Sequence, residues 1–196
     1  MLYIFDSIWL FFLFLPQNTA NLPSSVLFET FAITEGSYFC DNGRINLRSN
    51  APLEIIEAES NKLRGLLDPS NQTFAWSVEI KTLDGFNSPL QQEHFNENYM
   101  ETKRFPKATF TGKIIEKIDI QRDGQYTVRA KGKLTVHGVV QERILKGFLT
   151  VKKKNIRIQA SFMVPLADHS ITIPKIVFQK ISEEMFVSVD ATLQMR

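Results

Sequence analysis

Apolar and polar residues alternate with a period of two over most of the chain. This period is typical of β-strands that turn one face toward a core and the other toward water. In the clearest example Phe74, Trp76 and Val78 lie on one face, while Ser77 and Glu79 lie on the other. The other segments with this pattern are residues 37–40, 45–47, 56–58, 110–114, 126–136, 145–151, 156–164 and 187–193. The alternation therefore predicts eight or nine strands.

Turn-forming residues separate many of these segments, and helical periodicity is scarce. The predicted turns are Asp41-Asn42-Gly43, Asp68-Pro69-Ser70-Asn71, Asp123-Gly124 and Lys153-Lys154-Asn155. One short helix is expected over residues 90–102, after Ser88-Pro89, and a second helical turn is expected from Pro174. Two such helices are too few to cover a sheet of this size.

The apolar faces of the strands must therefore cover one another, in a sandwich or in a sheet closed into a barrel. Short sequential connections favour an all-β fold: an antiparallel up-and-down β-barrel of about eight strands with one or two short helices. A barrel of this size is either filled by its own side chains or holds one small ligand. Gly112, Gly132 and Gly147 fall on inward positions, where they mark either kinks in the barrel or room inside it.

The inward side chains form the predicted ligand-binding set. On the strands these are Phe74, Trp76, Val78, Phe110, Leu134, Val136, Phe162 and Val164, with Phe95, Tyr99 and Phe105 expected near a mouth or lid. A register shift of one residue would exchange the two faces of a strand, so this set depends on the strand pairing.

Composition and charge narrow the function further. The chain has 196 residues, 43% of them hydrophobic, and a formal net charge of +2. These values suit one globular domain and do not suit a nucleic-acid binder.

Residues 8–15 are uninterruptedly apolar and are followed by Pro16 and, four residues later, Ala20. This run is too short to span a membrane, which takes about 20 residues. Residues 1–20 are therefore predicted to be a signal peptide, and residues 21–196 to form the barrel domain.

Catalytic and metal-binding motifs are scarce in the sequence. It contains no G-x-S-x-G, no P-loop and no G-x-G-x-x-G, and its single cysteine, Cys40, rules out an intramolecular disulfide. No metal and no cofactor are expected. His137, directly before Gly138, is expected to serve in a turn or cap. One alternative is an acid/base or metal site in which Glu93, His94 and Glu97 meet Asp168 and His169.

Basic residues recur on the polar face of one predicted strand, namely Arg129, Lys131 and Lys133. Their simplest role is to keep that face in water. A second interpretation is transient contact with a membrane surface, because a lipid carrier gains from attraction to anionic headgroups.

Three short motifs follow one another along the chain: F-P-K-A-T-F at residues 105–110, G-K-L-T-V-H-G at residues 132–138, and the segment from Phe162 through Asp168 to Ile171. Together they resemble the patterns of the YceI-like family, and the resemblance covers residues 35–194. It implies a lipocalin-like antiparallel barrel, export to the bacterial periplasm, and an interior that binds a long polyisoprenoid or a similar amphiphile. It implies no catalytic residues.

The sequence thus predicts a periplasmic or secreted, non-catalytic protein that sequesters or carries a polyisoprenoid or another long apolar lipid inside a barrel. Two alternatives stay open. The first is a hydrolase or isomerase of a lipid-like substrate that uses His94, Glu97 and His169, and the second is a ligand-free structural or stress-response barrel. A homodimer is also compatible with the sequence.

Overall fold

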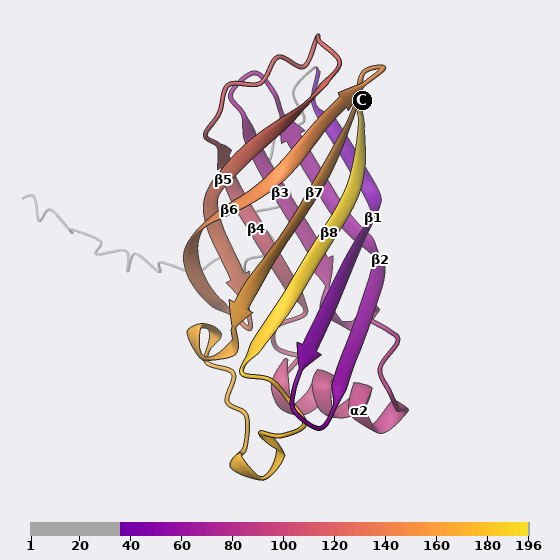
Figure 1. Cartoon of the computed structure of the whole chain (residues 1–196), viewed down its shortest axis with the longest axis vertical. Coiled ribbons are helices and arrows are strands. Elements are labelled where there is room, and N and C mark those ends of the chain that lie inside the picture. Colours follow the sequence, from indigo (N-terminus) through magenta and orange to yellow (C-terminus); the bar gives the residue numbers. More distant parts are fainter. Residues whose placement is uncertain (1–35, 196) are drawn as a thin grey trace, which may run out of the picture. The chain divides into compact units, whose positions relative to one another are not determined.

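The computed structural model describes residues 36–195, so the predicted signal peptide lies outside the described residues. Eight antiparallel strands form a closed barrel in which each strand pairs with its neighbours in sequence and β1 pairs with β8 (Figure 1). They are β1 (Tyr38–Asn50), β2 (Ile55–Asp68), β3 (Thr73–Glu79), β4 (Lys107–Ile114), β5 (Gly124–Val136), β6 (Val139–Lys152), β7 (Asn155–Pro165) and β8 (Glu184–Met195). The predicted up-and-down barrel of about eight strands is confirmed.

Helical structure in the described residues is confined to short segments. The longest is α2 (Pro89–His94), where the side chain of Ser88 accepts a hydrogen bond from the backbone N–H of Gln91, and it continues into the π-helical turn η2 (Phe95–Tyr99). The others are the 3-10 turns η1 (Ile80–Thr82), η3 (Leu166–His169) and η4 (Lys175–Val177). Both predicted helical segments are confirmed. Ser88 caps the first because its hydroxyl replaces a missing backbone partner.

The strand pairing confirms the predicted inward faces. Trp76 of β3 lies opposite Phe110 of β4, and Phe110 lies opposite Leu134 of β5. Phe162 of β7 lies opposite Val187 of β8. Directly opposed residues point to the same side of a sheet, so these side chains share the barrel interior.

One predicted turn is wrong. Asp41-Asn42-Gly43 does not end a strand, because β1 continues through it with a bulge where the pairing with β2 shifts register. A Cβ atom on Gly43 would lie 2.8 Å from the Cβ atom of Ala191 on β8. Glycine at this position therefore lets the bulged backbone approach the neighbouring strand closely. The turn was predicted because a glycine-containing bulge and a turn use the same residue types. His137 and Gly138, by contrast, form the predicted turn between β5 and β6, both with positive φ.

Side chains fill both ends of the barrel. The first end cluster gathers buried residues beside the turns that join β2 to β3 and β6 to β7: Tyr38, Leu67, Ile114, Leu149, Val151, Ile156 and Leu193. The second end cluster lies at the opposite end, beneath α2 and η3: Ala58, Ile80, Leu83, Met100, Leu166 and Ile171. Figure 1 shows α2 across this end of the barrel.

Gly112 and Gly132 lie opposite each other on β4 and β5. A Cβ atom on Gly112 would lie 2.1 Å from the carbonyl oxygen of Lys131, and one on Gly132 would lie 2.3 Å from that of Thr111. Both distances are far inside van der Waals contact with backbone, which cannot rotate away. These two glycines therefore allow a close approach of strands, as in a barrel kink.

We expect Gly112→Ala to lower the free energy of unfolding by about 1–3 kcal/mol, because the new methyl group forces β4 and β5 apart. Gly124→Ala is the matched control, since the nearest atom to its new Cβ lies 3.7 Å away. It should change the free energy of unfolding by less than about 0.5 kcal/mol. Urea unfolding measures both, and equal effects of the two substitutions would contradict the close approach.

Candidate functional site

An apolar cavity of about 130 Å³ lies inside the barrel between the two end clusters. All eight strands contribute to its wall, although β1 adds only Ile45 and β8 adds only Val189. The inward side chains of this wall are all aliphatic or aromatic, and the polar residues Ser77, Thr109 and Lys146 border the cavity from positions that alternate with inward ones. An apolar wall of this kind holds apolar groups and offers few partners to water.

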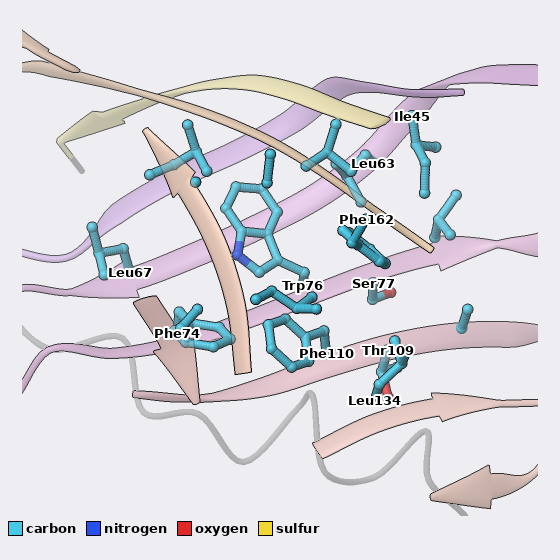
Figure 2. Close-up of a pocket in the computed structure, with 18 of the residues that line it drawn as sticks. Ile45, Leu63, Leu67, Phe74, Trp76, Ser77, Thr109, Phe110, Leu134 and Phe162 are labelled. Atoms are coloured by element: carbon cyan, nitrogen blue, oxygen red, sulfur yellow. The ribbon is translucent and has the colours of Figure 1, made fainter. Parts of the chain in front are cut away.

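Six residues of the predicted set line the cavity: Phe74, Trp76, Val78, Phe110, Leu134 and Phe162. Figure 2 shows the Trp76 ring lying among the side chains of Leu63, Phe110 and Phe162. The rings of Phe74 and Phe110 pack at a centroid distance of 5.0 Å. That these residues contact a ligand remains a prediction.

The other five predicted residues lie away from the cavity wall. Val164 is buried against Leu134 and Val187, and Val136 packs against the same group. Three aromatic residues belong to the end that α2 covers: Phe95 packs on Phe86 at 4.9 Å, Tyr99 contacts the second end cluster, and Phe105 lies edge-on to His137 at 4.7 Å. These aromatic side chains close one end of the barrel.

The absence of a side chain at Gly65 leaves the space that the Trp76 ring occupies. The two residues are opposite each other on β2 and β3, and a Cβ atom on Gly65 would lie 2.1 Å from the six-membered ring of Trp76. Any larger residue at position 65 would push the indole out of its position. The predicted set omitted Gly65, although its place between apolar residues of an alternating strand is a usable signal.

The volume of the cavity limits the size of the ligand that it can hold without rearrangement of its side chains. An engineered apolar cavity of about 150 Å³ stays dry and binds benzene, so a volume of about 130 Å³ suits one ring or a short branched chain. A longer apolar chain must displace the Trp76 ring or leave the cavity through its wall. The wall beside the cavity is discontinuous between β6 and β7. Pairing of β2 with β3 also ends, at Arg64 and Ser77, but there the bridge between Glu59 and Asp84 joins β2 to the segment that follows β3.

Strands β6 and β7 separate halfway along their length. Their pairing runs from Lys152 and Asn155 to Gly147 and Ala160 and stops there. Residues 139–146 of β6 pair only with β5, and residues 161–165 of β7 pair only with β8. Lys146, Gly147, Ala160 and Phe162, which flank this split, all line the cavity. The cavity therefore lies directly behind the split.

A polar cluster fills the lower end of the split. The Arg143 guanidinium donates to the Asp168 carboxylate, and the Gln141 amide donates to the Asp168 carbonyl at 2.7 Å. The His169 ring is fully buried, and its Nδ1 lies 3.1 Å from the carbonyl oxygen of Val139. A carbonyl only accepts, so Nδ1 carries the proton. Burial lowers the pKa of His169 and keeps the ring neutral.

The alternative acid/base site is not assembled. His94 and Glu97 are exposed on α2 and η2, while His169 is buried at the end of η3. Glu97 pairs with Lys103 at 3.2 Å, and within residues 36–195 no hydrogen bond or ion pair joins any two of the three proposed catalytic residues. Burial also raises the pKa of the Cys40 thiol, which opposes its use as a nucleophile.

Two further features of residues 36–195 bear on the site. They contain no group of three His, Cys, Asp or Glu side chains placed to hold a metal ion. Their helices are all too short and too polar to cross a membrane.

We expect His169 to make the fold acid-sensitive. Because its native pKa is lowered, the unfolded chain binds a proton first as the pH falls through about 6.5, so stability is lost below that pH and unaffected above it. His169→Asn should flatten the decline of the unfolding free energy between about pH 7 and pH 5.5, which for one proton is at most about 1.4 kcal/mol per unit. His94→Asn, at an exposed position, is the control. A decline unchanged by His169→Asn would contradict a buried neutral ring.

The comparisons with known proteins agree with this geometry. Residues 53–193 match the model of the YceI-like domain. A polyisoprenoid-binding domain from Saccharophagus degradans, implicated in plant cell wall breakdown, superposes with a TM-score of 0.69 at 13% identity, covering 83% of this chain and all of that one. BcnA from Burkholderia cenocepacia superposes with a TM-score of 0.64 at 12% identity, covering 76% of this chain and 95% of that one. No curated protein matches the sequence. The family match spans well over half of the chain, which therefore belongs to the YceI-like family.

Proposed function

We propose that this protein is an exported, non-catalytic carrier that sequesters a polyisoprenoid or a similar long apolar lipid inside its barrel. The apolar cavity behind the split supports this proposal most directly, because its wall offers carbon contacts and very few polar partners. The similarity to a domain described as polyisoprenoid-binding supports the same ligand class. Export is proposed from the signal-like residues 1–20 and from the family resemblance.

Apolar burial alone gives enough binding energy. Removing one methylene from water is worth about 0.8 kcal/mol, so ten to fifteen buried carbons contribute about 8–12 kcal/mol before the costs of association. Losses of several kcal/mol for lost motion and ordering still leave micromolar binding within reach. No charged anchor in the cavity is required for this affinity.

The length of the ligand's apolar chain determines how the barrel can hold it. The present volume suits a short apolar group, so a longer prenyl chain has to move the Trp76 ring from its place over Gly65. The polar end of such a ligand has no partners deep in the cavity and would remain near the split, beside the polar side chains of Gln141 and Arg143. Binding should therefore change the surroundings of Trp76.

We expect the prenyl alcohol geranylgeraniol to change the emission of Trp76. The chain has two tryptophans, and Trp9→Phe in the full chain leaves Trp76 as the single reporter. Ala130 lines the cavity, so Ala130→Leu fills part of it and should weaken binding about tenfold or more, the loss of roughly two methylene contacts.

The matched control is Thr127→Leu. Thr127 lies three residues earlier on β5, is exposed, and points away from the cavity, so the added bulk stays outside the barrel. This variant should bind the prenyl alcohol as the parent does. No emission change in the parent, or equal weakening by both variants, would contradict binding in the cavity.

A further inference from the structure

Exposed apolar side chains gather beside the split. Of the large apolar residues that are exposed in the described part of the chain, five lie on the outer faces of β6, β7 and β8: Val140, Ile144, Phe148, Met163 and Phe186. Ile144 is the most exposed of these, at 58%. Contiguous exposed apolar patches on soluble proteins mark surfaces that meet a partner.

The register shows that these residues surround the split. Met163 and Phe186 are directly paired on β7 and β8. If the pairing of β6 with β7 continued beyond Gly147 and Ala160, Ile144 would lie opposite Met163. Ile144 and Met163 therefore face each other across the split, and Phe148 lies just above it. Figure 1 shows the lower part of β6 bowing away from β7 at this place.

Lysines border the apolar residues on the β5 side. Lys131 is paired with Ile144, and Lys146 lies on β6 between Ile144 and Phe148. Lys133 follows on β5, opposite the acidic Glu142. All three lysines are exposed, and none of them forms an ion pair within residues 36–195. This edge of the surface is therefore positively charged and open to an anionic partner.

We infer that this split-side surface, formed by Val140, Ile144, Phe148, Met163 and Phe186 with Lys131, Lys133 and Lys146, docks onto an anionic lipid membrane. The inference rests on the proposed function, since it places the split, behind which the cavity lies, against the source of the lipid. Apolar side chains enter the boundary between headgroups and acyl chains, and lysines beside them attract anionic headgroups.

Charge favours a membrane over a second copy of the chain. In a two-fold dimer the same patch meets itself, which would bring the three lysines of one copy toward those of the other. An anionic bilayer meets the same lysines with opposite charge. The separated edges of β6 and β7 also favour a wet lipid interface, where water and headgroups satisfy unpaired backbone groups.

A fluorescent thiol label tests the docking directly. Ile144→Cys places the label at the split, and Lys62→Cys places it on β2, on the opposite side of the barrel. The native Cys40 is buried and should not react. With vesicles of phosphatidylethanolamine and phosphatidylglycerol that carry brominated acyl chains, the label at position 144 should be quenched and the label at position 62 should not. Quenching at both positions or at neither would overturn the inference.

Rates of prenyl alcohol uptake from vesicles and from micelles test the docking surface separately from the proposed function. Ile144→Ser should slow uptake of geranylgeraniol from the same vesicles about tenfold and leave its uptake from detergent micelles unchanged. Leu90→Ser on α2 is the control, since Leu90 is 59% exposed and lies away from the split. Lys131→Glu combined with Lys146→Glu should also slow uptake from vesicles, and the slowing should shrink in high salt.

The outcomes differ for the two proposals. Failure of the parent protein to take up the prenyl alcohol from micelles contradicts the proposed function itself. Normal uptake from micelles with no effect of Ile144→Ser on uptake from vesicles contradicts the docking surface alone. A dimer in light scattering that Ile144→Ser dissociates would show that a second copy covers this surface, and it would also overturn the inference.

Discussion

Every strand of this protein has one apolar face, and that face has to be covered by the other strands. The short helices in residues 36–195 cover one end of the barrel and none of its sides. Closing the sheet on itself turns all the apolar faces inward, and the pairing of β1 with β8 completes that closure. Glycine at positions 112 and 132 then lets β4 and β5 approach more closely than a Cβ atom at either position would allow.

The pairing of the strands is interrupted between β6 and β7. Both ends are packed with side chains, whereas β6 and β7 part halfway and the apolar cavity lies behind them. The polar residues near the split serve the fold: Arg143 and Gln141 hold η3 through Asp168, and the buried His169 holds the backbone of Val139. These contacts fix η3 against the lower half of β6.

Alternation was sufficient to predict the barrel, the inward faces and six cavity residues, because strand side chains alternate strictly. Alternation does not show at which level of the barrel an inward residue lies, and for that reason Val136 and Val164 were expected at a cavity that they do not line. A turn was wrongly predicted at Gly43, because β-bulges and turns use the same residues. The alternation predicted neither the split nor the cavity volume. Both depend on how side chains such as Trp76 pack in three dimensions, and no pattern in a single sequence reports that packing.

We expect a lipid to occupy the barrel interior, and native mass spectrometry of the protein purified from the organism that produces it detects such a lipid as added mass. The expected result is a population whose mass exceeds that of the chain by the mass of a prenyl lipid, which collisional activation releases intact. Protein that is repeatedly empty, and that gains no mass when a prenyl lipid is supplied, would contradict a lipid-carrying barrel.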